Sequence, residues 1–223
     1  MGLGAVVFDF DGVIIDSKEV QCKAFFQSYG KVVGEGTPDF EEFLSHAGNS
    51  LDNIFELMNL PQEMIVPYRE FSSKNIHQIK MFNGMQELIK ELYSMGIKIG
   101  LCTGKDRQRT LDILSYHQLL SFFDVIVCSD DVRNPKPSPD SLLACMEELN
   151  VSCEETVMIG DAANDIICAQ SCNVFSIAVL WGESKLENLK LKNPDAICST
   201  VVELRDTLLK KVNNTFIYKK MLS

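Results

Sequence analysis

Apolar runs alternate with amphipathic segments over the larger part of the chain, from Phe82 onward. Four of the apolar runs predict buried strands, at 97–102, 124–128, 156–159 and 174–180. Apolar residues at helical spacing predict helices at 84–93, 106–116, 138–149 and 162–172. A weaker strand at 196–198 and a helix at 201–212 complete the pattern. Strands that alternate with helices are typical of a doubly wound parallel sheet, so we expect an α/β fold.

An earlier apolar run, at 5–8, predicts the first strand, and it ends abruptly in Asp9 and Asp11. Gly12 allows the chain to turn away directly behind them. Two carboxylates this close repel each other, and both stay ionised only when a cation lies between them; otherwise one keeps its proton. A hard divalent ion such as Mg²⁺ suits oxygen ligands of this kind. A polar turn after a strand explains the stretch equally well when it is taken alone.

The region from residue 17 to about 80 predicts helices throughout and contains no convincing strand. A helical block between the first strand and the next element is an insertion, because it cannot belong to a parallel sheet. We therefore expect a core domain formed by 1–16 and 81–223, and a helical cap domain, 17–80, that closes over the strand ends. Its hinges are expected near 16–17 and 81–84. The alternative is that these helices pack permanently on the sheet as part of one core.

Composition limits the classes of protein that fit. The 223 residues are 46% hydrophobic and 23% charged, which is typical of a water-soluble globular chain with one domain or a core plus an insertion. No apolar stretch is long enough to span a bilayer, and the N-terminus lacks the pattern of a secretory signal. A net charge of −10 opposes binding to nucleic acid. It does not exclude a small anionic substrate, because a metal ion and a few lysines can reverse the potential locally.

Eight cysteines occur without any C-x-x-C pair, and several lie inside apolar runs, as Cys128 does. This usage predicts buried free thiols in a reducing cytoplasm rather than a disulfide framework. Cys168 and Cys172 lie one helical turn apart, but no His nearby completes a site for a soft metal.

The segment Asp9-Phe10-Asp11-Gly12-Val13 resembles the first motif of the haloacid dehalogenase superfamily, whose members are mostly phosphatases. That family also has a Ser or Thr at the end of a second strand, a Lys before a third strand, and an acidic pair after a fourth. The matching residues occur here in the same order, as Thr103, Lys136, and Asp161 with Asp165. The resemblance covers the chain from residue 9 to residue 165, and it implies the α/β core with a helical cap.

The resemblance also implies roles. Asp9 attacks phosphorus and becomes an aspartyl-phosphate, while Asp11 acts as general acid and base. The carboxylates of Asp9 and Asp161 and the backbone carbonyl of Asp11 hold Mg²⁺. Thr103 and the backbone at Gly104 bind the phosphate.

Two further residues complete the expected site. Lys136, which is fixed between Pro135 and Pro137, neutralises charge on the phosphate. Asp165 holds either a metal-bound water or Lys136 from the second layer of the site.

Departures from the family pattern narrow the choice of activity. Dehalogenases lack the second Asp, which is present here as Asp11. Hexose-phosphate mutases carry a His early in the first cap helix and an Arg in the cap loop; Gln21 stands at the first place, and 48–51 holds no Arg. Ala162 and Asn173 replace a common Ser or Thr and a common Gly, without loss of an irreplaceable group.

We therefore expect a cytoplasmic Mg²⁺-dependent phosphatase acting on a small phosphorylated metabolite, similar to the phosphoglycolate phosphatase and β-phosphoglucomutase branch. A phosphomutase, or a non-catalytic phosphate-binding protein on the same fold, remains an alternative. The sequence selects neither a substrate nor an oligomeric state. Among the other polar residues that could face the site, Lys105 and Arg107 are expected to belong to a solvated helix start. The cap candidates are His46, Asn49, Lys74 and His77.

Overall fold

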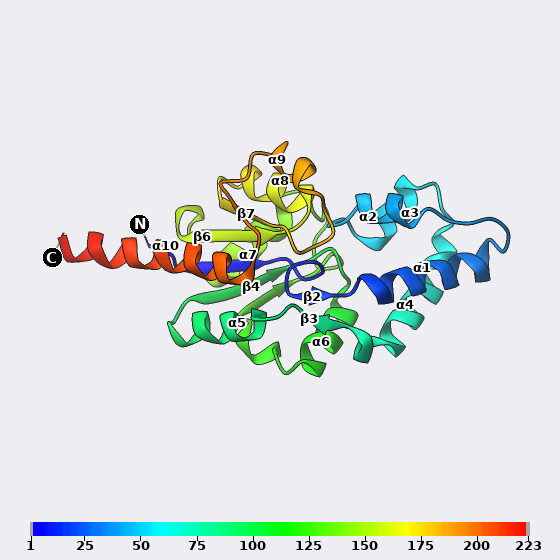
Figure 1. Cartoon of the computed structure of the whole chain (residues 1–223), viewed down its shortest axis with the longest axis horizontal. Helices are drawn as coiled ribbons and strands as arrows, with labels where there is room; N and C mark the ends of the chain where they lie inside the picture. Colours follow the sequence, from blue (N-terminus) through cyan, green and yellow to red (C-terminus); the bar gives the residue numbers. More distant parts are fainter. Residues whose placement is uncertain (1, 222–223) are drawn as a thin grey trace.

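A six-stranded parallel sheet forms the centre of the molecule, in the order β5-β4-β1-β6-β7-β8 (Figure 1). The structure is a computed structural model; it describes residues 2–221, and the side chains of residues 2–212. The strands of the sheet are β1 (Ala5–Phe8), β4 (Lys98–Cys102), β5 (Val125–Val127), β6 (Thr156–Gly160), β7 (Phe175–Val179) and β8 (Ala196–Cys198). The predicted doubly wound α/β fold is confirmed.

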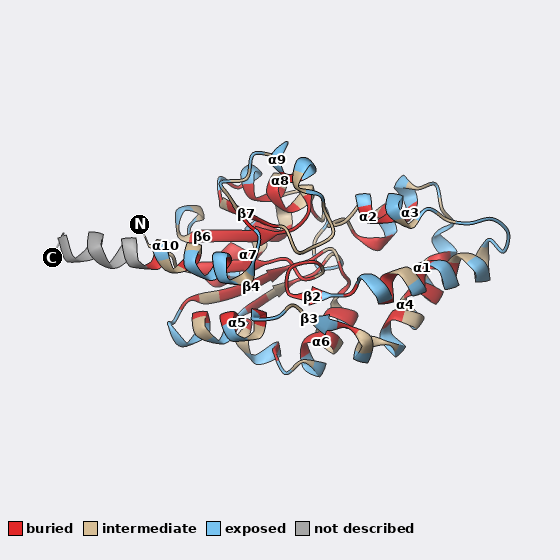
Figure 2. Ribbon diagram, viewed as in Figure 1, coloured by how far each residue is buried: buried red, intermediate tan, exposed pale blue. Residues whose placement is uncertain are grey.

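Helices cover both faces of this sheet. They are α5 (Met85–Ser94), α6 (Arg107–Tyr116), α7 (Asp140–Leu149), α8 (Ala163–Ser171), α9 (Leu186–Lys190) and α10 (Val201–Met221). Side chains of α5, α6 and α10 share one hydrophobic cluster with Val6 and Phe8 of β1. Side chains of α7 and α8 share another with Ala5 and Val7. Because successive strand residues point to opposite faces, a strand that is covered on both sides is apolar at every position, and β1 is fully buried (Figure 2).

Four helices between the first and second strands of the sheet lie together at one end of the molecule (Figure 1). They are α1 (Lys18–Val32), α2 (Phe40–Ser45), α3 (Leu51–Leu57) and α4 (Ile65–Lys74). These helices enclose a hydrophobic cluster of their own, in which Phe25, Phe43, Phe55 and Tyr68 contact one another. The helical block therefore has a core separate from the two clusters that flank the sheet.

The two chain segments that join this block to the sheet pair with each other. β2 (Ile15–Asp16) and β3 (Lys80–Met81) form an antiparallel pair, in which Ile15 lies opposite Met81. The absence of strands in 17–80 was thus predicted wrongly at Lys80. Such a two-residue pair has no sequence signal of its own, because alternation needs a longer run to become visible.

The last predicted helix was given too short a range. α10 continues to Met221, beyond the predicted end at 212.

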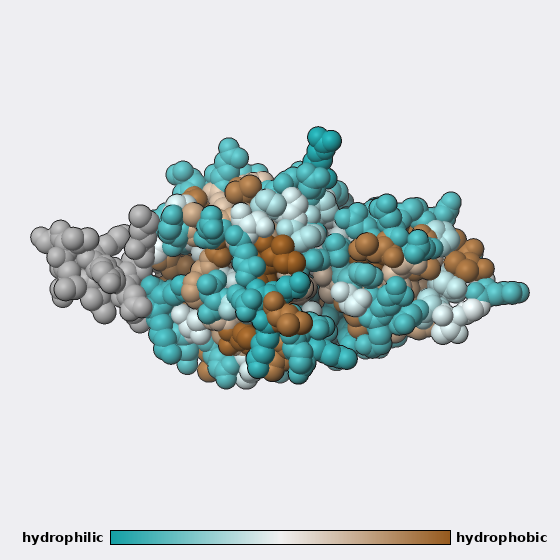
Figure 3. All heavy atoms as spheres, turned by 90° about the horizontal axis from the view of Figure 1, so that it is seen from above, coloured by the Kyte–Doolittle hydropathy of each residue, from teal (hydrophilic) through white to brown (hydrophobic). Residues whose placement is uncertain are grey.

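Hydrophobic side chains on the face drawn in Figure 3 lie scattered between hydrophilic ones, over the sheet end and the helical block alike. Within the described residues, no helix combines the length and the apolar character that crossing a membrane requires.

Candidate active site

The predicted site residues meet at the carboxyl edge of the sheet. Asp9 follows the last residue of β1, Thr103 follows β4, and Asp161 follows β6. Parallel strands bring their carboxyl ends to one edge, so residues far apart in sequence converge there. Lys136 comes from the long loop after β5, and its ammonium reaches the same place.

A buried ion-paired group forms the base of the site. The Nζ of Lys136 donates to Asp9 Oδ1 at 2.7 Å, to Asp165 Oδ1 at 2.6 Å and to the carbonyl of Cys102 at 2.9 Å. Lys136 is only 1% exposed, and the two carboxylates keep its pKa above the usual range although burial acts to lower it. Burial raises the pKa of Asp9 to about 7, even though Lys136 lowers it. All three charges depend on one another, because none has access to bulk water.

Asp161 lies close to both Asp9 and Asp165. Oxygen atoms of Asp9, Asp161 and Asp165 all lie within 4.8 Å of one another. Gly12, with a φ of +77°, and Gly182 both press against the carboxylate of Asp161, and a Cβ at either glycine would lie 2.2 Å from its Oδ2. Burial raises the pKa of Asp161 well above its ordinary value, with the neighbouring acids adding to the effect.

This donor set fits a hard divalent cation. The donors are buried carboxylate oxygens without sulfur or nitrogen, and their negative charge exceeds what Lys136 compensates. Asp165 is already held by Lys136 and by the backbone N–H of Ala162 at 3.0 Å. Asp9 and Asp161 are therefore the carboxylates that remain available to an ion.

Asp11 lies beside this group with one oxygen engaged. Its Oδ1 accepts from the hydroxyl of Ser17 and from Nε2 of Gln21 at 3.3 Å, and it pairs with the ammonium of Lys105 at 3.1 Å. No described residue is recorded as a hydrogen-bond partner of its other oxygen, Oδ2. Asp11 can therefore exchange a proton with a bound molecule while its side chain remains fixed.

Thr103 and Gly104 line the same cavity as Asp9 and Asp11. The Thr103 hydroxyl accepts the backbone N–H of Lys105 at 3.1 Å, while Asp106 caps α6 through the N–H of Arg109. Thr103 is thus free of the helix-capping role that a Thr-Gly pair commonly has. Gly104 lies directly beneath the loop between α2 and α3, and a Cβ there would lie 2.4 Å from the carbonyl oxygen of Asn49.

The same loop also contacts the opposite side of the site. A Cβ on Gly48 would lie 3.1 Å from Cβ of Asn164, whose side-chain amide donates to the carbonyl of Ala47 at 3.3 Å. Residues 47–49 of the helical block therefore fit between the β4 loop and the start of α8. This close approach depends on the missing side chain at Gly104.

Replacing Gly104 by Ala is expected to displace this loop. The new methyl group meets backbone rather than a mobile side chain, so the loop has to move away. We expect a fall in kcat/KM of about 10-fold or more, with faster proteolysis of the segments around β2 and β3. Gly96→Ala is the control, because its Cβ has open space, although its φ of +75° costs some stability. Equal kinetics and equal proteolysis in both variants would contradict the expectation.

Four of the predicted site residues border a cavity of about 60 Å³, whereas Lys136, Asp161 and Asp165 do not line it. Besides Asp9, Asp11, Thr103 and Gly104, three charged residues that were not predicted as site residues line it: Lys105, Arg109 and Glu183. Glu183 comes from the loop after β7; its Oε1 is buried without a recorded partner, and burial, with Asp11 nearby, raises its pKa to about 8. A signal was present for Glu183 and Lys105, since both closely follow strand ends.

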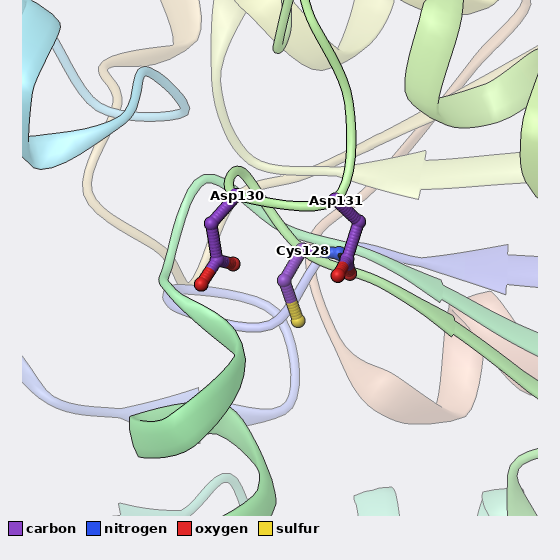
Figure 4. Close-up of side chains that lie close together, drawn as sticks. All are labelled: Cys128, Asp130 and Asp131. Atoms are coloured by element: carbon purple, nitrogen blue, oxygen red, sulfur yellow. Dashed lines mark hydrogen bonds between the residues drawn. The ribbon is translucent and has the colours of Figure 1, made fainter.

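The expectation of a solvated helix start was wrong for Lys105, which is only 6% exposed, but Arg107 does lie outside the cavity. The Arg107 guanidinium pairs with Asp131 at 2.6 Å, and its backbone N–H donates to Asp130. Cys128, Asp130 and Asp131 gather near each other at the end of β5 (Figure 4). Arg107 already compensates the charge of this acidic group. Its contacts join the loop after β5 to the start of α6.

Among the four cap candidates, Asn49 lines the cavity, whereas Lys74 and His77 are exposed at the surface. His46 borders a different and larger hollow beside the start of α8.

The family profile described as haloacid dehalogenase-like hydrolase matches residues 6–179. The chain belongs to this family. The family prediction made from the four motifs, and the prediction that the protein is a hydrolytic enzyme, are thereby confirmed.

The chain is similar over nearly its whole length to a curated protein and to a solved structure. The chain is 31% identical to Pyrophosphatase PpaX from Bacillus mycoides over 216 residues, which cover 96% of this chain and 100% of the relative. It is also similar to the crystal structure of a predicted phosphatase from Clostridium acetobutylicum, with a TM-score of 0.85 and 29% identity. The match covers 94% of this chain and 100% of that one.

A third similarity concerns the fold alone. The structure of a predicted phosphoglycolate phosphatase from Haemophilus somnus 129pt superposes with a TM-score of 0.78 at 16% identity, covering 87% of this chain and 93% of that one.

Proposed function

We propose that the protein is a Mg²⁺-dependent phosphatase that hydrolyses a small phosphate ester or anhydride through a phosphorylated Asp9. The observation that carries this proposal is the position of Asp9. Its Oδ1 is held by Lys136, and its carboxylate borders a cavity that Asp11 and Thr103 also line. A fixed carboxylate with a second oxygen, Oδ2, left over is suited to attack phosphorus and to divide one difficult step into two.

The remaining residues fit the rest of the reaction. Oδ2 of Asp9 forms a bond to phosphorus while the bond from phosphorus to the leaving oxygen breaks, and the proton on Asp11 goes to that oxygen. Asp11 then takes a proton from water, whose oxygen bonds to the phosphorus of the aspartyl-phosphate; the bond from phosphorus to Asp9 Oδ2 breaks, which releases inorganic phosphate and restores the Asp9 carboxylate. Thr103 and the backbone at Gly104 donate hydrogen bonds to the phosphoryl oxygens, and Lys136 offsets their charge.

Asp9, Asp161 and the backbone carbonyl of Asp11 would hold Mg²⁺, with Asp165 supporting the site through Lys136. When bound, the ion supplies positive charge to the phosphoryl oxygens. The exclusion of sulfur and nitrogen donors from the group and the unbalanced buried charge support this choice.

Neither alternative gains support from a particular contact. Gln21, at the place where mutases carry a His, donates to Ser17 and Asp11, and an amide cannot exchange protons as an imidazole does. A phosphate-binding protein without catalysis has no use for a carboxylate with a free oxygen beside the phosphate. The name of the Bacillus mycoides relative makes pyrophosphate the first substrate to examine.

We also propose that the helical block, 17–80, is a cap that opens and closes over the site. Its separate hydrophobic cluster and its two adjacent linkers, β2 and β3, support the predicted hinges near 16–17 and 81–84. The fit of residues 47–49 against Gly104 supports a closed position. We expect the protein in a reducing compartment such as the cytoplasm, since all eight cysteines are free thiols.

The test of this function is release of inorganic phosphate from a panel of small phosphorylated compounds, beginning with pyrophosphate. Chelation is expected to abolish turnover reversibly, and Mg²⁺ to restore it. Ca²⁺ is expected to inhibit, because its larger and more flexible coordination shell misplaces Asp9 relative to phosphorus. Full activity after exhaustive chelation would exclude the metal assignment.

Thermal unfolding provides a readout of the ion that is independent of turnover. Mg²⁺ at about 100 times its Kd should stabilise the folded protein by about 2.7 kcal/mol. Asp161→Asn should lose this shift in Tm. Asp130→Asn is the matched control. Asp130 also follows a strand end, but it accepts the backbone N–H of Arg107 and does not line the cavity. Equal shifts in both variants would place the ion elsewhere.

A further inference from the structure

Arg109 is a buried cation in the cavity that the phosphoryl transfer described above does not use. It belongs to the first turn of α6, it is only 4% exposed, and it lines the same cavity as Asp9 and Thr103. Its guanidinium lies 5.5 Å from the centre of the Tyr68 ring, which is part of α4 in the helical block. It therefore lies where the sheet domain and the helical block meet over the site.

The recorded contacts engage only part of this guanidinium. Its Nε donates to Asp106 Oδ2 at 2.6 Å, and the guanidinium lies over the ring of Tyr68. A guanidinium carries five N–H donors, so donors remain for a bound molecule. The carboxylate of Asp106 is shared between two guanidinium groups, because its Oδ2 also lies 3.3 Å from Nε of Arg69. It therefore does not fully compensate the charge of Arg109.

The side chains that surround Arg109 solvate its positive charge less well than water does. On the side of the helical block the cavity is lined mainly by the apolar and aromatic side chains of Phe43, Leu51, Ile54 and Tyr68, with the polar Gln21 and Asn49 beside them. A cation buried against such a surface is costly unless an anion completes its surroundings. The cavity volume of about 60 Å³ is room for roughly four water molecules, since each needs about 15 Å³. The missing anion must therefore be small and close to the reacting phosphate.

We propose that Arg109 determines specificity by binding a second anionic group on the leaving side of the substrate. The substrate class is then a small phosphorylated anion, in which a phosphate or carboxylate lies within a few atoms of the bond that breaks. Pyrophosphate and short phosphorylated carboxylic acids share this chemistry. A guanidinium suits it, because its planar fork matches both phosphate and carboxylate. The inference rests on the proposed phosphatase function and adds the class of substrate to it.

The experiment compares matched pairs of substrates. Pyrophosphate is paired with acetyl phosphate, and phosphoglycolate with 2-hydroxyethyl phosphate. In each pair the part of the substrate beyond the bond that breaks carries a negative charge in the first compound, while it is still bonded to phosphorus, and carries none in the second. The wild-type protein should prefer the charged member of at least one pair in kcat/KM, and the preferred pair identifies the phosphate or the carboxylate as the natural partner. In Arg109→Gln this preference should fall by about 10- to 100-fold, mostly through KM. Arg109→Lys should restore part of it, since it keeps the charge without the fork.

Arg69→Gln is the matched control. Arg69 contacts the same carboxylate, Asp106, but does not line the cavity. If Arg109 acts only by holding the helical block in place, Arg109→Gln and Arg69→Gln should both lower the rates for the two members of each substrate pair by the same factor. Such a result, or a preference that is unchanged in Arg109→Gln, would overturn the inference.

The two proposals fail in distinguishable ways. A wild-type protein that releases phosphate from none of the four compounds would contradict the phosphatase function itself. A wild-type protein that hydrolyses acetyl phosphate and 2-hydroxyethyl phosphate as efficiently as their partners would leave the function intact and reject the role of Arg109.

Discussion

Replacement of Asp9 by Asn is expected to lower phosphate release by about 10³-fold or more, and to leave the fold intact. An amide has nearly the size of the carboxylate but cannot attack phosphorus. The amide oxygen can still accept the hydrogen bond that Lys136 Nζ now donates to Asp9 Oδ1 at 2.7 Å. The loss should therefore appear in kcat rather than in the folding of the protein.

The pKa of Asp9 explains why the fold tolerates this change. Burial raises the pKa of this carboxyl to about 7, well above its value in an unfolded chain. An acid whose pKa is raised by folding binds its proton more tightly in the folded state, so stability is lost as pH rises through that pKa. In metal-free protein at pH 8, a neutral amide avoids this loss. We expect a Tm for Asp9→Asn equal to or higher than that of the wild type.

Asp130→Asn serves as the control, as it does for the metal. Steady-state phosphate release and thermal unfolding of both variants check the prediction. Activity of more than a few per cent in Asp9→Asn, at an unchanged Tm, would remove Asp9 from the role of nucleophile. A collapse of Tm would instead assign Asp9 to the support of Lys136.

The sheet and the base of the site were predictable because both depend on local sequence. Buried parallel strands are continuous apolar runs, and their carboxyl ends meet at one edge whatever the details of packing. Asp9, Thr103 and Asp161 each stand directly after such a run, so their convergence follows from topology. Lys136 was found through its motif, and the structure brings it to Asp9 and Asp165.

Arg109 was not predictable in this way. The sequence does carry one partial signal. Arg109 lies on the buried side of α6, one turn before Ile113, where an apolar residue would be expected. What the sequence cannot reveal is the partner, because Tyr68 reaches Arg109 only through the docking of one group of helices on another. Lys105 was misassigned for the same reason: its burial depends on Asp11 and on the loop 47–49 above it.

The largest expected effect on stability belongs to Lys136. Replacement by Met keeps much of the buried volume and removes the ammonium that pairs with Asp9 and Asp165. Asp165 is completely buried, so its carboxylate would lose its cation with no water to replace it. Removing one partner of a buried ion pair costs about 3–5 kcal/mol, and Tm in the absence of Mg²⁺ should fall accordingly. Lys31→Met, at the exposed end of α1, is the control and should leave Tm unchanged.

A double variant separates charge from packing. In Lys136→Met/Asp165→Asn the unpaired carboxylate is gone, so much of the lost stability should return, and the two substitutions should be strongly non-additive. The amide can still accept the N–H of Ala162 that Asp165 Oδ2 now accepts at 3.0 Å, which preserves the start of α8. Catalysis should not return, because the phosphoryl oxygens would still lack the ammonium. Chemical denaturation and phosphate release measured on the four proteins of this cycle test both halves. Additive losses of stability would show that Lys136 acts through its packing, and recovered turnover would show that its charge is not needed in the reaction.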